Sequence, residues 1–262
     1  MFPHHRESIR NITEKFKNDP EVLALLISGS IAHGFEDEGS DIDCLIIVPN
    51  DVHAKKTEAK ALVYNETESC TYEGGYIDGK YITFDFMKTV AGKGSEPARF
   101  AFDGVITAFS KINGLQDVIN SITTFPVEKK QDNIYRFSCQ IEAWKWFTGE
   151  ALKRKNDYLL QRAVTNLILF GGRMILAHHE VLYPFHKWFL KVLEKNANNP
   201  EELMSKINLL LKSPSTDAAN DFYSYIKNYT DWEIDTAKSW PNQFLKDSEL
   251  NWLELSVPVG DI

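Results

Sequence analysis

The sequence predicts an α+β protein in which a mixed β-sheet flanked by helices is followed by an all-helical region. Short apolar runs with strand character alternate with helical segments over the first half of the chain. After residue 124 no convincing strand pattern remains, and apolar residues recur at helical spacing. The chain has 262 residues, of which 43% are hydrophobic, so it can build two cores. We therefore predict two domains, residues 1–124 and residues 125–262.

The elements of the first domain follow from periodicity and from turn residues. Ile9, Ile12 and Phe16 recur at helical spacing and predict a helix over residues 6–17. Apolar runs predict strands over residues 22–28, 41–48 and 105–109, and shorter patterns predict helices or helical turns over residues 30–34, 52–62, 97–102 and 116–122. The dipeptide Asp78-Gly79 tolerates the positive φ of a tight turn. It predicts a β-hairpin that joins residues 75–77 to residues 80–86.

The second domain is predicted to consist of helices alone. Ile134, Phe137 and Ile141 lie on one apolar stripe, as amphipathic helices require. The predicted helices cover residues 134–150, 158–178, 184–195, 201–211 and 217–229.

Two residues after the first predicted strand favour phosphate binding. Gly29 and Ser30 lie between an apolar strand and a short helical turn. Glycine lets the backbone approach a phosphate closely, and the N–H groups at the start of a helix bind anions. The hydroxyl of Ser30 adds a donor.

Three acidic residues on predicted strands favour a metal site. Asp41 and Asp43 project from the same face of one strand, because side chains alternate along a strand. Asp85 supplies a third carboxylate between two phenylalanines on the second hairpin strand. Asp78 and Asp103 are competing acids, but the apolar neighbours of Asp85 favour that residue. Three converging carboxylates suit Mg²⁺, which prefers oxygen ligands.

The arrangement of these motifs resembles the nucleotidyltransferase superfamily that includes polymerase beta and the antibiotic nucleotidyltransferases. The resemblance implies that Gly29 and Ser30 hold the nucleotide phosphates. It implies that Asp41 and Asp43 are ligands shared by two Mg²⁺ ions, and that Asp85 completes the second metal site. The helical half is similar to the aminoglycoside- and lincosamide-modifying members only in kind.

The resemblance also implies a reaction. An acceptor hydroxyl, bound in a cleft between the domains, attacks the α-phosphorus of ATP or another nucleoside triphosphate, and pyrophosphate leaves. The general base is either Asp85 or Glu142. The resemblance makes an antibiotic of the aminoglycoside or lincosamide type the preferred acceptor. The acidic loop at residues 36–39 would attract a polycation, which favours an aminoglycoside over an uncharged acceptor.

Two other functions stay open at this point. The acceptor could be a protein side chain, although enzymes of that kind are usually shorter. The chain could also sense nucleotide without turnover, which the intact aspartates disfavour. The helical half could in addition bury the face of a homodimer.

The composition limits which partners and which cellular location we expect for this protein. The net charge of −8 and the lack of a run of basic and aromatic residues disfavour a polynucleotide. The apolar stretch at residues 159–176 contains Arg162, Asn166 and Arg173, which excludes a membrane-spanning helix and predicts no membrane partner. Three widely spaced cysteines suggest neither disulfides nor a zinc site, and a cytoplasmic protein is expected.

Overall fold

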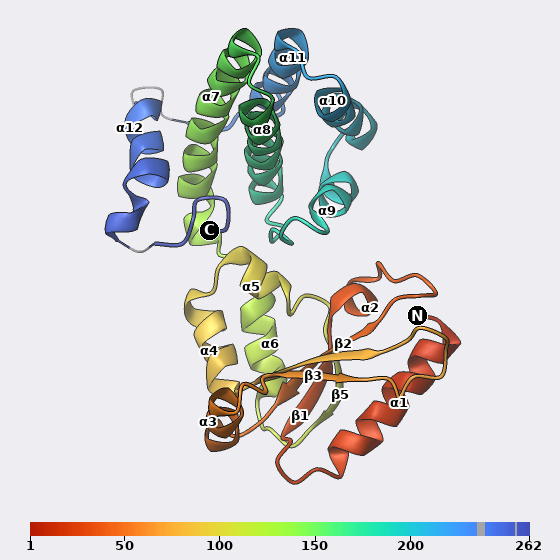
Figure 1. The fold of residues 1–262 in the computed structure, drawn as a ribbon. Helices are drawn as coiled ribbons and strands as arrows, with labels where there is room; N and C mark the ends of the chain where they lie inside the picture. The colour runs from red at the N-terminus through yellow and green to blue at the C-terminus, as the bar shows by residue number, and fades with distance from the viewer. Residues whose placement is uncertain (235–238, 255) are drawn as a thin grey trace. The chain divides into compact units, whose positions relative to one another are not determined.

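The computed structural model describes residues 1–234, 239–254 and 256–262, and the chain divides into two compact units, Met1–Thr124 and Phe125–Ile262 (Figure 1). The first unit contains a five-stranded sheet with the strand order β3-β4-β2-β1-β5. Strands β2 and β4 run parallel, whereas the other neighbouring strands run antiparallel. The sheet is therefore mixed, which confirms the predicted fold class.

The five strands are β1 (Ala24–Ile27), β2 (Ile42–Ile47), β3 (Val63–Glu66), β4 (Ile77–Ile82) and β5 (Ile106–Ser110). The helices of this unit are α1 (Pro3–Lys17), α2 (Gly29–His33), α3 (Asn50–Glu58), α4 (Phe84–Lys93), α5 (Glu96–Phe100) and α6 (Leu115–Thr123).

The sheet separates two apolar cores. Leu25 of β1 is fully buried in the core that includes Phe16 of α1. Its neighbour Leu26 points to the opposite face and packs in the core that includes Met87 of α4 and Ile119 of α6. Figure 1 shows α1 on one side of the sheet and α4 and α6 on the other. Strands β1 and β2, at the centre of the sheet, are mostly buried on both faces, which explains why they read as nearly continuous apolar runs.

The hairpin predicted around Asp78-Gly79 is wrong. Both residues lie inside β4, which pairs with β2 on one side and with β3 on the other. A Cβ atom at Gly79 would lie 2.8 Å from Cδ1 of Ile46 and 3.1 Å from Cβ of Tyr64. Glycine therefore occupies this position because the strand is crowded, and not because the chain turns. The hairpin that does form joins β4 to the unpredicted strand β3.

The second unit is helical, and none of its described residues lies in a strand. Its α-helices are α7 (Lys130–Arg154), α8 (Asp157–His178), α9 (Phe189–Asn196), α10 (Pro200–Lys212), α11 (Thr216–Lys227) and α12 (Trp240–Phe244). Shorter turns are the 3₁₀-helices η1 (Val127–Lys129) and η3 (Asn251–Leu253) and the π-helical turn η2 (Leu245–Glu249). Helices α7 and α8 pack along each other, and α8 also contacts α9, α10 and α11.

Two glycines in α8 let neighbouring helices approach closely. A Cβ atom at Gly171 would lie 2.9 Å from the Phe222 ring of α11. A Cβ atom at Gly172 would lie 2.4 Å from the ring of Phe189, in α9. The two adjacent glycines thus allow α9 and α11 to pack closely against α8.

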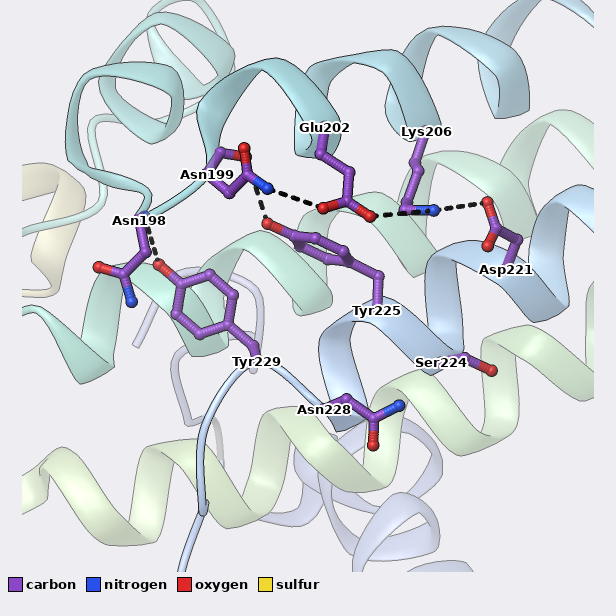
Figure 2. Close-up of a pocket in the computed structure, with 9 residues that line it drawn as sticks. All are labelled: Asn198, Asn199, Glu202, Lys206, Asp221, Ser224, Tyr225, Asn228 and Tyr229. Carbon is purple, nitrogen blue, oxygen red and sulfur yellow. Dashed lines mark hydrogen bonds and ion pairs between the residues drawn. The ribbon is translucent and has the colours of Figure 1, made fainter.

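A polar groove of about 460 Å³ lies between α10 and α11 (Figure 2). Lys206 donates to Asp221 at 2.8 Å, and Asn199 donates to Glu202 at 2.8 Å. The charged side chains that line the groove pair with one another, so they join the two helices.

Within the described residues, no helix combines the length and the apolar character needed to cross a membrane.

We expect Gly172→Ala to destabilise the protein by about 1–3 kcal/mol, because the added methyl group would overpack the contact with Phe189. Gly149→Ala is the matched control. Gly149 lies in α7, and a Cβ atom there would have no described atom within 4 Å apart from the backbone of its own helix. Alanine at this position should therefore stabilise the protein by about 0.5–1 kcal/mol. Urea unfolding of both variants measures the difference. Equal effects of the same sign would contradict the packing account.

Candidate active site

The glycine-serine turn predicted from the sequence lies directly against the second strand. Strand β1 ends at Ile27, and α2 begins at Gly29, which has φ +63°. The N–H of Ser28 donates to the carbonyl oxygen of Asp43 at 2.9 Å and ties the turn to β2. A Cβ atom at Gly29 would lie 1.7 Å from Oδ2 of Asp43. Only glycine accepts this backbone conformation and also leaves space for the carboxylate.

Ser30 brings an unused hydroxyl to the same turn. Its side chain is buried, at 6% exposure. Its Oγ has no hydrogen-bond partner in the described part of the chain. Buried polar groups are usually paired, so this hydroxyl is available to an incoming ligand.

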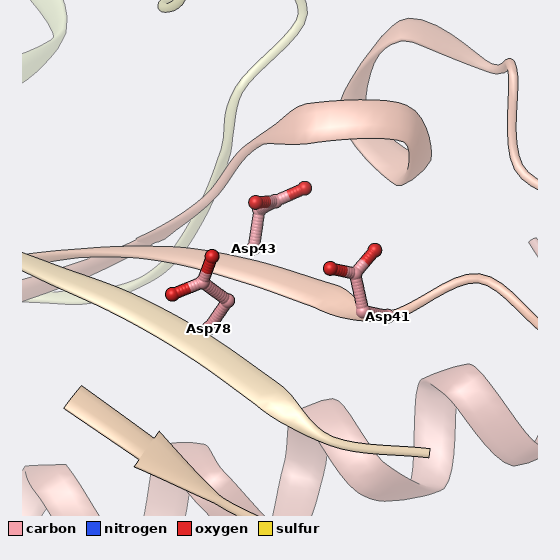
Figure 3. Close-up of side chains that lie close together, drawn as sticks. All are labelled: Asp41, Asp43 and Asp78. Atoms are coloured by element: carbon pink, nitrogen blue, oxygen red, sulfur yellow. The ribbon is translucent and has the colours of Figure 1, made fainter. Parts of the chain in front are cut away.

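Three aspartates come together beside this turn: Asp41, Asp43 and Asp78 (Figure 3). Asp43 lies opposite Asp78 in the parallel pairing of β2 with β4, and Asp41 directly precedes β2. One carboxylate oxygen from each residue lies within 4.8 Å of the other two, and all three residues are half-buried. Asp41 and Asp43 therefore lie side by side, as predicted.

Asp85 does not belong to this cluster, and its predicted position on a strand is wrong. It lies in the first turn of α4, which begins after Thr83, whose hydroxyl accepts from the N–H of Phe86 at 3.0 Å. Asn50 donates to Asp85 at 2.8 Å and lowers its pKa, and Lys88 donates at 3.2 Å with the same effect. Asp85 is exposed and stabilises the start of a helix. The third acid of the cluster is Asp78, the competitor that the sequence analysis set aside.

The opposite face of β2 contributes nothing polar to the site. Cys44 is buried in the core next to α1. Burial raises the pKa of its thiol, and the negative charges of Asp43 and Asp78 raise it further. The cluster therefore offers oxygen ligands only, and three crowded carboxylates repel one another unless a cation lies between them. This donor set fits Mg²⁺ and disfavours a softer metal.

Two tyrosines that the sequence analysis missed, Tyr72 and Tyr76, connect the segment before β4 to the segment before β2. The carboxylate of Asp41 raises the pKa of the phenol of Tyr76, which lies directly before β4. Tyr72 donates to the carbonyl oxygen of Ser40 at 2.6 Å. Burial raises the pKa of Tyr72 to about 12. Nothing in the spacing of the sequence indicated these contacts, because they join two loops that are far apart in the sequence.

The negative charge of the acidic loop is partly compensated by neighbouring groups. Glu36 forms an ion pair of 2.7 Å with the amino group of Met1, and this pairing lowers the pKa of the carboxyl. Asp37 accepts from the N–H of Gly39 at 3.0 Å within the loop. The attraction of this loop for a polycation is therefore reduced.

Two other titratable side chains of the first unit, Arg99 and His33, have structural contacts. Arg99 is buried and donates to the carbonyl oxygens of Gly94 and Ala91, so it joins helices rather than binding phosphate. His33 stacks on Phe100 with ring centroids 4.4 Å apart, and burial lowers its pKa.

Glu142, the alternative general base, lies in the second unit. It accepts from the hydroxyl of Tyr223 at 2.6 Å and pairs with Lys227 at 3.4 Å. Both contacts hold the Glu142 side chain against α11.

Comparison with known proteins identifies the class. Residues 9–78 match the family model described as a nucleotidyltransferase domain. Over these residues the chain therefore has a nucleotidyltransferase domain, which confirms the resemblance drawn from its motifs. The matched segment includes all three clustered aspartates and ends at Asp78, before Asp85.

A solved structure of a nucleotidyltransferase-like protein from Exiguobacterium sibiricum is similar over 95% of this chain and 79% of that chain, with a TM-score of 0.47 and 10% sequence identity. No curated protein matches the chain.

We expect Gly29→Ala to abolish the response of the protein to divalent cations. Wild-type protein should melt at a higher temperature when Mg²⁺ or Mn²⁺ is added, because bound metal stabilises the folded state. The added methyl group would displace the carboxylate of Asp43 and remove this rise. Gly34→Ala is the control, because Gly34 has φ +68° but no atom within 4 Å of its built Cβ. Both variants should lose about 1–2 kcal/mol from backbone strain. The assignment fails if Gly29→Ala keeps the full metal-induced rise.

Proposed function

We propose that this protein is a Mg²⁺-dependent nucleotidyltransferase that transfers a nucleoside monophosphate from ATP, or another nucleoside triphosphate, to a hydroxyl group of a small molecule. The observation that carries the proposal is the cluster of Asp41, Asp43 and Asp78 beside the turn at Gly29 and Ser30. The nucleotidyltransferase domain that contains these residues supports it.

In this proposal the aspartates bind metal, and the turn at Gly29 and Ser30 binds phosphate. Asp41 and Asp43, with Asp78 in the role first assigned to Asp85, would hold two Mg²⁺ ions. Bound Mg²⁺ would act as a Lewis acid toward the phosphate oxygens and the acceptor hydroxyl. The N–H groups that follow Gly29 and the unpaired hydroxyl of Ser30 would bind the triphosphate.

The bond changes follow from this arrangement. The acceptor oxygen forms a bond to the α-phosphorus while the bond from that phosphorus to the pyrophosphate oxygen breaks. The proton of the acceptor hydroxyl passes to a carboxylate, for which we propose Asp78. Asp85 is engaged by Asn50 and Lys88, away from the cluster. Glu142 lies in the second unit and is engaged by Tyr223 and Lys227, so it is a weaker candidate base.

An aminoglycoside or lincosamide remains the proposed acceptor, which would make the protein an antibiotic-modifying enzyme. The support is the resemblance of the motifs to enzymes of that kind, together with the acidic charge of the first 120 residues. The pairing of Glu36 weakens the electrostatic part of this argument. A homodimer and a cytoplasmic location stay predictions from the sequence.

We expect Asp78→Asn and Asp41→Asn to abolish turnover while the thermal stability stays at or above that of the wild type. Each change removes one negative charge from a crowded cluster, so repulsion in the metal-free protein should fall. Asp85→Asn is the control and should retain turnover, because its carboxylate bonds to Asn50 and Lys88 instead. If Asp85→Asn is inactive and Asp78→Asn is active, the cluster is not the catalytic site.

Release of pyrophosphate is the test of the function itself. Full-length protein with Mg²⁺ and each of the four ribonucleoside triphosphates is offered aminoglycosides, lincosamides or a protein extract. We expect pyrophosphate in proportion to one of the antibiotics. Transfer of labelled nucleotide to protein would support the protein-modifying alternative instead. Nucleotide binding without pyrophosphate under every condition would support the sensor.

A further inference from the structure

The helical unit contains a cavity of about 510 Å³ that the proposed reaction does not use. This volume falls within the range of pockets that bind small molecules. Trp144 and Phe147 of α7, Phe170 of α8 and Phe244 of α12 contribute to its walls. The Trp144 ring centroid lies 5.3 Å from that of Phe147 and 6.3 Å from that of Phe244. The cavity is therefore lined by several aromatic faces and edges.

One polar group in this wall has no partner. Asn166 of α8 is 8% exposed, and its Nδ2 is buried without a hydrogen bond in the described part of the chain. Gln140, which lines the same cavity, shows the contrast. Its Nε2 donates to Ser248 at 2.9 Å, and its Oε1 accepts from the indole N–H of Trp144 at 3.0 Å. Buried donors are normally paired, so Asn166 requires an acceptor that the described residues do not supply.

Charged groups of both signs line the same cavity. Arg162 lies one helical turn before Asn166, and its guanidinium carbon is 5.9 Å from the Trp144 ring. Glu249 and Asp261 line the cavity as well. The walls thus offer donors from α8 and acceptors from the C-terminal part of the chain, which suits a ligand whose edge carries both an acceptor and an amino group. Asp247 also lines the cavity but is paired with Arg136. Glu249 and Asp261 are therefore the acids that would repel a simple anion.

We propose that this cavity binds a planar heteroaromatic ring of the nucleobase type. The ring packs against the aromatic walls, and a ring nitrogen or carbonyl oxygen accepts from Nδ2 of Asn166. An exocyclic amino group on the same ring donates to the acidic side of the cavity. The site is separate from the aspartate cluster and does not depend on the proposed transferase reaction.

Calorimetric titration of the full-length protein, without divalent metal, tests this site. The probes are adenosine, guanosine, cytidine and uridine, which carry no phosphate, and toluene, which is planar but has no acceptor. We expect at least one nucleoside to bind. Asn166→Asp should weaken that binding by about tenfold or more, because a carboxylate replaces the donor with an acceptor.

Three further variants test whether the affinity depends on the donor of Asn166, on a change of charge elsewhere, or on the aspartate cluster. Asn166→Leu should lose the same affinity while it keeps the melting temperature, because an unpaired buried donor is removed. Asn208→Asp, at an exposed position of α10, and Asp41→Asn should leave the affinity unchanged. The proposal is overturned if no nucleoside binds, which would indicate a cavity filled by water alone. It is also overturned if toluene binds as tightly as the nucleosides, or if both Asn166 variants bind normally.

Discussion

The parallel pairing of β2 with β4 is the interaction on which the candidate site depends. It places Asp43 of β2 directly opposite Asp78 of β4, and Asp41 lies directly before β2. Because side chains alternate along a strand, a shift of one residue in this register would turn Asp78 toward the core beside α1. The apolar residues Ile42 and Ile77, which pair with each other and are fully buried, oppose such a shift. Burial on one face of the sheet thus fixes the chemistry on the other.

The aspartates are held close although they repel one another, and the surrounding contacts explain how. Gly29 lets the helix start approach Asp43, and the N–H of Ser28 bonds to the carbonyl oxygen of that residue. Asp41 acts on the phenol of Tyr76, and Tyr72 donates to the backbone carbonyl of Ser40. These contacts fix the backbone that carries Asp41 and Asp43 before any cation is bound, which reduces the reorganisation that binding requires.

Local pattern was enough to predict the class of fold and most of the candidate site. The apolar runs that became β1 and β2, the turn at Gly29 and the acids that follow all depend on residues close in sequence. The third acid could not be predicted in the same way. Asp78-Gly79 has the local signature of a turn, but contacts with Ile46 and Tyr64 hold Gly79 in a strand. Asp85 has apolar neighbours on both sides, but Thr83 starts a helix there. In both cases a tertiary contact or a helix cap decided the outcome.

The candidate site is also confined to one unit of the chain. Every residue of the two cores that support it lies before residue 124, and so do all of its aspartates. Such a module keeps its geometry when the sequence attached to it changes. Over evolution, one catalytic framework of this kind can be joined to different helical bundles, and its range of substrates can diversify while the reaction it performs stays the same.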